Sequence, residues 1–485
     1  MNRLSLFRAI KRLFVLPTIG LLLGILSGCA TNPVTGDRDF VLMSEQDEIA
    51  LGKKSHESIM KQYSVYHNEP LQKLVNDLGQ KLAQDSHRSH LDFTFTLLDS
   101  PQVNAFALPG GYIYITRGIM AYMNNEEQLA GVLGHEIGHV TARHGVRQHS
   151  AQTTAGLLGA VVAIATGSKT VADASSQLGG ALVRGYGRSH ELEADRLGAE
   201  YLAVTGYDPE KMLGVVGILK DQEQFEIQIA KEENRQPRVY HGVFSTHPRN
   251  DQRLQEVVRA AEKFKNPNAR QTDPETFLRY MDGVTFGDSE KQGIVHGNRF
   301  FHKDLNLSID FPEDWKIENQ PTQLVALRQD REAAMIVQID QPTANESSQD
   351  FLKRKFPKLS NGQSIDRRSY TGIVQGQTPF GNGPVRVASV LHEGRAYVLS
   401  LFAKSALPEA PFFDTAKSIS TIRWRDKRKA REKKIQLVRA RKGTTFAKLA
   451  KKSNLGEYAQ ERLRLLNGMY PDGEPEPGQL IKIIK

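Results

Sequence analysis

His135-Glu136-Ile137-Gly138-His139 lies in a stretch, from Asn125 to about His144, in which apolar residues recur every three or four positions. This period predicts an amphipathic helix with one buried face. The two histidines are four residues apart, so they project from the same side of the helix. Imidazoles on adjacent turns can hold one divalent cation between them, so the stretch predicts part of a metal site. The expected buried face consists of Leu129, Val132, Leu133, Ile137 and Val140.

Glu136 lies next to the two histidines around this helix. From there its carboxylate can reach a water at the metal without being a ligand itself. A metal ion makes such a water more acidic, and a nearby carboxylate can take the proton that the water loses. Hydrolysis requires this arrangement, but the five-residue string stays a hypothesis until a third ligand is found.

A candidate for the third ligand stands in His190-Glu191-Leu192-Glu193-Ala194-Asp195, at the start of a second predicted helix over about 190–205. At 100° per residue, Glu191 and Glu193 point about 200° apart, so at most one of them can face the metal. Glu191 shares its face with Asp195, whose carboxylate could accept the other ring N–H of a ligating histidine. We therefore expect Glu191 to be the ligand and Asp195 to support the site. The alternative is a surface helix whose acids are stabilised by the N-terminal dipole.

A longer ligand pattern, with a glycine three residues and a histidine six residues after the motif, is absent from the sequence. Its positions are occupied by Ala142 and Gly145. We therefore expect His144 and His149 to be exposed, or to lie beside the ligands, rather than to bind the metal.

The N-terminus, from Met1 to Cys29, has the order of a targeting segment. A basic stretch leads into an apolar run over 13–25, which is shorter than the ~20 residues that a membrane-spanning helix needs. Leu26-Ser27-Gly28-Cys29 then resembles a bacterial lipobox, and Cys29 is the only cysteine, so an internal disulfide is excluded. We predict lipidation of Cys29 on the periplasmic side of the cell envelope, with the outer membrane favoured because Ala30 stands where Asp would retain the protein. The alternative is a thiol buried in an uncleaved membrane helix.

The composition, with 39% hydrophobic and 25% charged residues, is that of a folded protein, and the length predicts about three domains. Much of the net charge of +9 comes from Arg423 to Lys434, where eight Lys or Arg stand against Asp426 and Glu432. An exported protein meets little nucleic acid, so we expect a solvated linker and no nucleic-acid partner. A weak attraction to anionic lipid or cell-wall polymer is the alternative.

Around the motif the chain alternates helical and strand-like patterns. Helices are expected over 44–62, 71–86 and 155–165, with Ser44 as the N-cap of the first. Pro109-Gly110-Gly111 separates two strand-like runs within 102–116, which predicts a hairpin. Strand-like runs between about 298 and 424 predict a mostly antiparallel domain, and 435–485 has the pattern strand, helix, helix, strand.

Taken together, these motifs resemble peptidase family M48, in particular its periplasmic lipoprotein-like members. The resemblance covers roughly 44–262 and rests on Asn104 to Gly111 with Thr116-Arg117-Gly118, His135 to His139 with Arg143-His144, Glu191 to Asp195, and Thr246-His247-Pro248 with Arg253. It implies one zinc ion per chain, bound by His135, His139 and Glu191. It further implies that Glu136 is the catalytic acid and base and that Asp195 is a second active-site acid.

The resemblance also places His247 near the open coordination position. There it could stabilise the oxyanion of the reaction, or it could occupy the fourth position and silence the site. The alternative is a histidine packed at a helix entry before Pro248. The hairpin, through Asn104, Ala105, Phe106 and Ala107, would offer a strand edge to an extended peptide, with little preference for its sequence.

The C-terminal pattern resembles a LysM module, which implies binding to glycans that contain N-acetylglucosamine, and so to peptidoglycan. The resemblance rests on Lys442-Gly443-Thr444-Thr445-Phe446, Leu466-Asn467 and Pro477-Gly478-Gln479-Leu480. Thr444 stands where such modules commonly have Asp, which puts the glycan affinity in doubt more than the fold.

We therefore expect an α+β multidomain protein. A mainly helical zincin-type metallopeptidase domain with a small β-hairpin or sheet precedes a mostly antiparallel α/β sheet domain and a small LysM-like βααβ domain. The expected boundaries are 1–29 signal peptide, 30–43 tether, 44–265 peptidase, 290–425 antiparallel domain, 426–434 basic linker and 435–485 LysM-like domain. The expected function is a zinc endopeptidase acting on misfolded or assembling envelope proteins. The rival is a lipid- and glycan-tethered chaperone or scaffold whose metal site is latent or masked.

Overall fold

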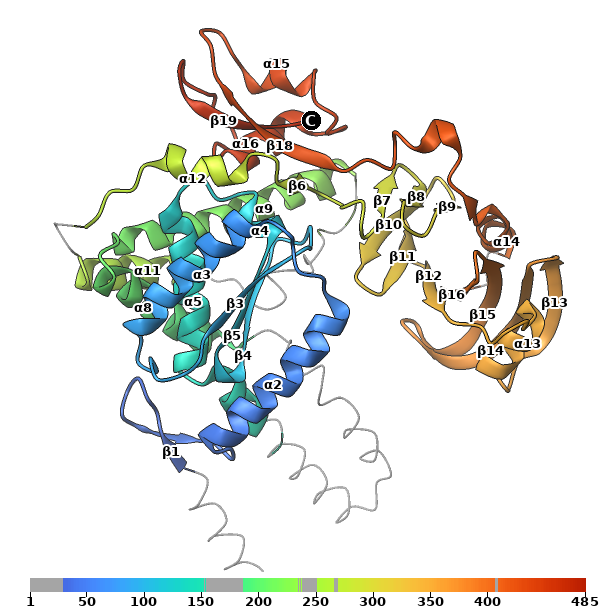
Figure 1. Cartoon of the computed structure of the whole chain (residues 1–485), viewed down its shortest axis with the longest axis horizontal. Helices are drawn as coiled ribbons and strands as arrows, with labels where there is room; N and C mark the ends of the chain where they lie inside the picture. The colour runs from blue at the N-terminus through green and yellow to red at the C-terminus, as the bar shows by residue number, and fades with distance from the viewer. Residues whose placement is uncertain are drawn as a thin grey trace, which may run out of the picture. The chain divides into compact units, whose positions relative to one another are not determined.

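The computed structural model describes residues 29–151, 153, 186–233, 235, 237, 251–265, 269–405 and 409–485. The chain divides into two compact units (Figure 1): unit 1 comprises Met1–Asp282 with Gln436–Ile483, and unit 2 comprises Gly283–Ile435 with Ile484–Lys485. The helix expected over 155–165 lies outside the described residues, and so does His247. None of the described helices has the length and apolar character needed to cross a bilayer.

The centre of unit 1 is a three-stranded sheet in the order β3-β5-β4. Strand β4 (Ala105–Leu108) and strand β5 (Tyr112–Thr116) are antiparallel and joined by the short 3-10 helix η1 (Pro109–Gly111), which confirms the hairpin. Strand β3 (Thr94–Leu98) pairs with β5 in parallel, which the sequence did not predict. Because β4 is at the edge of this sheet, one side of its backbone has no partner strand in the described structure.

Helices cover both faces of this sheet (Figure 1). On one face, α2 (Glu45–Gln62) packs Ile59 against Phe106 and Tyr114. Ser44 is its N-cap, as predicted, and accepts a hydrogen bond from the Asp47 N–H. On the other face lie α3 (Glu69–Gln84) and α5 (Glu126–Thr141), and α3 buries an apolar stripe. That stripe consists of Leu71, Val75, Leu78 and Leu82.

The helix with the two histidines, α5, packs closely against α8 (Arg188–Val204). Small residues make this approach possible: a Cβ added at Gly138 would lie 3.1 Å from the Ala194 carbonyl oxygen, and one added at Gly198 would lie 3.1 Å from the His135 backbone nitrogen. The close approach brings the start of α8 beside the histidines of α5. The remaining elements of this part are β1 (Cys29–Thr31), β2 (Arg38–Phe40), α4 (Arg117–Met120), η3 (Pro209–Lys211), α9 (Met212–Glu232), α11 (Asp251–Lys263) and α12 (Pro274–Met281).

The C-terminal elements have the predicted order of strand, helix, helix and strand: β18 (Lys433–Arg439), α15 (Phe446–Ala450), α16 (Ala459–Leu466) and β19 (Leu480–Ile484). Residues 436–483 belong to the same compact unit as the metal-site helices. The fully buried Lys482 donates from Nζ to the carbonyl oxygens of Ala121 and Met123, at 2.6 and 2.8 Å. Burial lowers the pKa of Lys482 well below its usual value. Leu465 joins Phe225 and Ile229 of α9 in one apolar cluster, so residues 436–483 pack firmly against the rest of unit 1.

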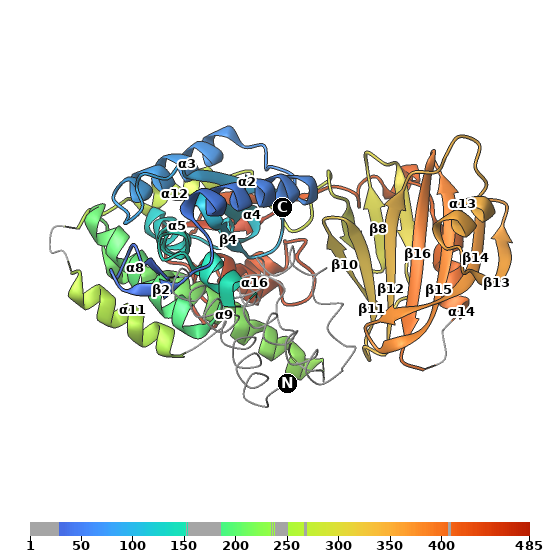
Figure 2. The same ribbon diagram turned by 90° about the horizontal axis from the view of Figure 1, so that it is seen from below.

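Unit 2 is built on a seven-stranded antiparallel sheet in the order β10-β11-β12-β16-β15-β14-β13 (Figure 2). A four-stranded sheet, β17-β9-β8-β7, belongs to the same unit, and Phe412 of α14 joins strand residues such as Met335 and Tyr397 in the main core. The expectation of a separate, mostly antiparallel domain is confirmed. Its elements are β6 (Thr285–Phe286), β7 (Ile294–His296), β8 (Arg299–His302), β9 (Leu307–Asp310), β10 (Trp315–Gln320), β11 (Gln323–Arg328), β12 (Ala333–Asp340), α13 (Ser348–Lys355), β13 (Ser360–Asp366), β14 (Ser369–Thr378), β15 (Gly381–His392), β16 (Arg395–Ala403), α14 (Glu409–Ser418), β17 (Ser420–Thr421) and η4 (Trp424–Asp426).

Candidate metal centre

His135, His139 and Glu191 converge on one buried point between α5 and α8. The Nε2 atoms of the two histidines face each other at 3.0 Å. The Glu191 carboxylate lies 3.6 Å from Nε2 of His135 and 3.5 Å from Nε2 of His139. Two imidazole nitrogens and a carboxylate are a donor set that zinc accepts, and Zn–N bonds of about 2.0–2.1 Å would need only a slight spreading of the two rings. The three side chains are thus arranged to hold a divalent cation.

Asp195 lies one turn after Glu191 on the same face of α8, as the spacing predicted. Its Oδ1 is 2.9 Å from Nδ1 of His135, on the side of the ring away from the convergence point. A carboxylate at this place can accept the Nδ1–H and so fix Nε2 as the atom that binds a metal. Glu136 is 2% exposed and comes from the same turn of α5 as His135.

His139 is held by a different chain of contacts, in which His144 lies beside the ligand, one of the two positions expected for it, and Glu193 was not expected to take part. Its Nδ1 is 2.7 Å from Nδ1 of the fully buried His144, and Nε2 of His144 is 3.0 Å from the Glu193 carboxylate. Burial lowers the pKa of His144. Burial also acts to raise the pKa of Glu193, but hydrogen bonds from His144 and Arg147 outweigh it and lower that pKa to about 2. Glu193 does point away from the metal position, as predicted, yet it reaches His139 through His144.

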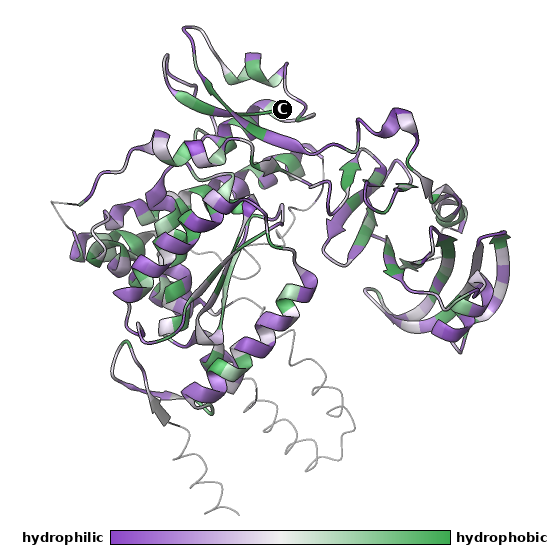
Figure 3. Cartoon of the chain, in the orientation of Figure 1, coloured by the Kyte–Doolittle hydropathy of each residue, from purple (hydrophilic) through white to green (hydrophobic). Residues whose placement is uncertain are grey.

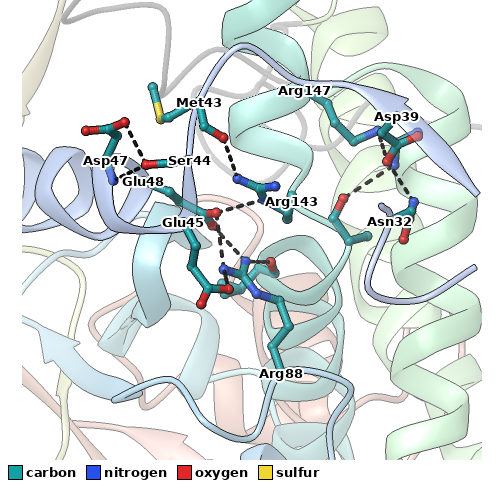
Figure 4. Close-up of polar contacts among 12 residues, drawn as sticks. Asn32, Asp39, Met43, Ser44, Glu45, Asp47, Glu48, Arg88, Arg143 and Arg147 are labelled. Carbon is teal, nitrogen blue, oxygen red and sulfur yellow. Dashed lines mark hydrogen bonds and ion pairs between the residues drawn. The ribbon is translucent and has the colours of Figure 1, made fainter. Parts of the chain in front are cut away.

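The same chain of contacts continues into the N-terminal strands (Figure 4). Arg147 donates to Glu193 at 2.9 Å, and its Nε lies 3.4 Å from the Asp39 carboxylate of β2. Asp39 also accepts a hydrogen bond from the Asn32 amide at 2.8 Å. The hairpin that follows Cys29 is therefore attached to the segment that ends α5, close to His139.

A buried ionic cluster lies beside this hairpin (Figure 4). Arg88, which is fully buried, donates to Glu48 and to Glu45, both at 2.8 Å, and to the Val140 carbonyl at 3.0 Å. Arg143, in the left-handed region at φ 57°, donates to Glu48 at 2.8 Å. The cluster joins α2, the loop after α3 and the C-terminal end of α5 around two buried guanidinium groups.

Tyr186 is a second residue that sequence reasoning missed. Its ring stacks on the His139 ring, with centroids 4.0 Å apart and an interplanar angle of 17°. Burial raises the pKa of its hydroxyl group, and the charges of Glu136 and Glu191 act in the same direction. A small cavity lies between this ring, His139 and the β4 residues Ala107 and Leu108. Ala107 and Leu108, at the end of the edge strand, therefore lie beside His139.

Two of the expected site residues receive no side-chain description. His247 lies outside the described residues. The backbone of Arg253 is part of α11, but the position of its side chain is not described.

The side chains of Asn104, Ala105, Phe106 and Ala107 are all buried, so this strand could offer a peptide its backbone rather than its side chains.

Comparison with known proteins places these residues within a recognised domain. Residues 70–261 match the model of peptidase family M48. The β-barrel assembly-enhancing protease of Yersinia pestis is 29% identical over 260 residues, which are 52% of this chain and 51% of that protein. Its Escherichia coli K12 counterpart is 32% identical over 223 residues, 44% of this chain and 43% of that protein. The mitochondrial metalloendopeptidase OMA1 of Saccharomyces cerevisiae is 27% identical over 239 residues, 46% of this chain and 67% of that protein. The chain thus spans about half the length of the bacterial relatives.

Proposed function

Residues 70–261 form a metalloprotease domain of peptidase family M48, and from this premise we propose that the chain is a zinc-dependent endopeptidase acting on proteins of the bacterial envelope. One observation carries the proposal. The Nε2 atoms of His135 and His139 and the carboxylate of Glu191 meet at a buried point, and Glu136, the neighbour of His135 on α5, is buried as well.

The three ligands His135, His139 and Glu191 would leave one position of a tetrahedral site open. Zinc supplies there a Lewis acid that polarises a carbonyl group and lowers the pKa of water. Burial supports this assignment, because three ligand side chains that are each at most 5% exposed are shielded from water that would compete for their bonds to the ion. Among the described residues one such cluster is present, so we propose one zinc ion per chain.

Glu136 is the general base in this proposal. Its carboxylate takes the proton of the attacking water and then passes it to the leaving amine. Asp195 acts at a distance from the scissile bond: it accepts the Nδ1–H of His135 and holds the ring in the tautomer that presents Nε2. His247 is proposed to act at the open coordination position. There it would either stabilise the oxyanion formed during peptide hydrolysis or occupy the position itself and inhibit the enzyme.

The substrate is proposed to bind as an added strand along β4, next to Asn104, Ala105, Phe106 and Ala107. Support comes from the position of β4 at the sheet edge and from the cavity that Ala107 shares with His139. Pairing through backbone hydrogen bonds gives affinity with little sequence preference. This mode of binding suits unfolded or misfolded proteins, whose segments are extended.

The location and the substrate class rest on the relatives and on the N-terminal pattern. Two bacterial relatives are named for enhancing β-barrel assembly, so we propose misfolded or assembling outer-membrane proteins as substrates. A lipid on Cys29 would anchor the chain to the outer membrane, facing the periplasm. The segment 435–485 would add contact with peptidoglycan if its LysM-like pattern binds glycan.

Removing and restoring the metal tests the proposal. We expect a strong zinc chelator to abolish cleavage of denatured casein and of an unfolded outer-membrane β-barrel protein. One equivalent of Zn²⁺ should restore cleavage, because an ion held only by side chains of the protein can be removed and replaced. The measurement is the cleavage rate before chelation, after it and after reloading. Undiminished cleavage by the metal-free chain would refute the zinc assignment.

The rival function is a tethered chaperone or scaffold. Inactivity of both the wild type and His247→Ala, with retained binding of the unfolded protein, would favour that function.

A second prediction concerns the contact between His139 and His144. His144→Phe keeps an aromatic ring but removes the hydrogen-bond partner of His139 Nδ1. We expect the affinity for Zn²⁺ to fall roughly 10- to 100-fold, the usual cost of losing a partner that orients a ligand. Competition titration with a chromophoric chelator measures it. His190→Phe is the matched control, because His190 stacks on His144 at 4.4 Å, and it should change the affinity only slightly. Equal losses in the two variants would assign the effect to packing.

A further inference from the structure

The basic segment that follows β17 is an ordered part of unit 2, and we call its residues 423–431 the basic turn. Its Trp424–Asp426 portion forms the 3-10 helix η4. Asp426 is buried, its carboxylate lies 3.2 Å from the Arg299 guanidinium, and its carbonyl accepts the backbone N–H groups of Lys429 and Ala430. Ala430 is also buried, in a cluster with Phe301 and Ile422. The backbone is therefore fixed from the inside by one carboxylate and one apolar contact.

Fixing the backbone in this way presents the cations of the basic turn to solvent. Its six basic side chains, Arg423, Arg425, Lys427, Arg428, Lys429 and Arg431, are all exposed. The one acid of the basic turn, Asp426, pairs with Arg299 and with Lys429, and Glu432, which follows the turn, pairs with Lys434. Within the described part of the chain, no carboxylate lies at ion-pair distance from Arg425, Lys427 or Arg428. The chain between α14 and β18 is accordingly mostly purple, hydrophilic, in Figure 3.

Trp424 stands among these cations and is 85% exposed. The only other tryptophan, Trp315, is 4% exposed and lies in the core of unit 2. A single exposed apolar residue is ordinary in a folded protein. Trp424 differs because a fixed turn holds its indole ring in solvent among several cations, which suits contact with a charged surface. Tryptophan is enriched at the membrane–water interface, where its ring lies at the level of the lipid headgroups.

We propose that the basic turn binds the surface of a bilayer that contains anionic phospholipid, with Trp424 entering the headgroup layer. The exposed cations supply attraction to the lipid phosphates, at about a fivefold gain in affinity for each Lys or Arg near the surface. Trp424 supplies the apolar contact that an interaction of charges alone lacks. A neutral glycan would make no use of the cations, and a nucleic-acid strand would need a row of stacking rings where this turn has one.

The proposal rests on the proposed envelope location but not on catalysis. Its consequence is a second attachment to the membrane, in unit 2, besides a lipid at Cys29.

The test uses residues 30–485, which carry the described structure without Cys29, and vesicles of phosphatidylethanolamine and phosphatidylglycerol. We expect co-flotation with these vesicles and a blue shift of tryptophan emission, and weak binding to phosphatidylcholine vesicles. Arg425→Gln/Lys427→Gln/Arg428→Gln should weaken binding roughly 100-fold. Trp424→Ser should abolish the blue shift, because the remaining Trp315 is buried.

The matched control, Lys53→Gln/Lys54→Gln/Lys61→Gln, removes the same charge from exposed positions of α2 in unit 1 and should bind nearly as well as the wild type. Equal losses in the two triple variants would overturn the proposal, since the effect would then follow net charge alone. Binding of single-stranded DNA or of isolated peptidoglycan without binding of vesicles would also overturn it. Casein cleavage, measured in parallel without vesicles, reports on the proposed peptidase separately, so a failure of one proposal is distinguishable from a failure of the other.

Discussion

Glu136→Gln is expected to lower the cleavage rate of a denatured protein substrate roughly 10²- to 10⁴-fold, the usual contribution of a positioned general base. The amide has nearly the shape of the carboxylate but cannot take a proton from the attacking water. Because Glu136 is not one of the three converging side chains, bound zinc should remain at one ion per chain. The measurements are initial rates on casein and the metal content of the purified variant.

A matched control separates this effect from a general loss of charge. Glu57 is an exposed acid of α2, and Glu57→Gln should cleave at the wild-type rate. If Glu136→Gln kept the wild-type rate with its zinc in place, the base would have to be another group. If it lost its zinc, the residue would belong to the ligand set rather than to proton transfer.

Arg88→Leu is expected to destabilise unit 1 by about 3 kcal/mol, because removing one partner of a buried ion pair leaves the other buried charge only partly compensated. Glu48 is 1% exposed and would keep only the Arg143 contact, while Val140 would lose a donor to its carbonyl. Denaturant unfolding followed by circular dichroism measures the change. The loss should also loosen the end of α5, which carries His139.

Two further variants sharpen this prediction. Adding Glu48→Gln to Arg88→Leu should recover part of the stability, since a buried amide costs less than a buried carboxylate that has lost one of its two guanidinium partners. Lys73→Leu breaks an exposed pair with Asp77 on α3 and should leave the unfolding midpoint almost unchanged. An Arg88→Leu protein as stable as Lys73→Leu would show that the cluster contributes nothing to the fold.

Local sequence determined the parts of the fold that depend on neighbours along the chain. Ser44, Asn125 and Asp208 cap helices with their own side chains, and Pro109 with its two glycines turns the hairpin. The i, i+4 spacing of the two histidines, and of Glu191 with Asp195, predicted which side chains share a face. Those two helical faces account for the converging triad and for the contact between Asp195 and His135.

Contacts between distant segments could not be predicted in the same way. The parallel pairing of β3 with β5 depends on the path of the chain between them, which leaves no periodic signal. Arg88 and Glu48 are charged, and charged residues are usually exposed, so the sequence did not predict their burial. Only the packing of three segments buries them together. Glu193 was judged by its direction from the metal alone, and His144 was expected either to be exposed or to lie beside the ligands. Their role arises because His144 bridges from Glu193 to the far side of the His139 ring.

The central claim is that side chains from two separate helices, α5 and α8, form one zinc site. Equilibrium dialysis of the metal-free chain against Zn²⁺, followed by elemental analysis, tests it most directly when wild type and Glu191→Ala are compared. We expect one tightly bound zinc ion per wild-type chain and at least a hundredfold weaker binding by Glu191→Ala, since two histidines on one helix remain. One zinc ion bound with undiminished affinity by Glu191→Ala would contradict the account.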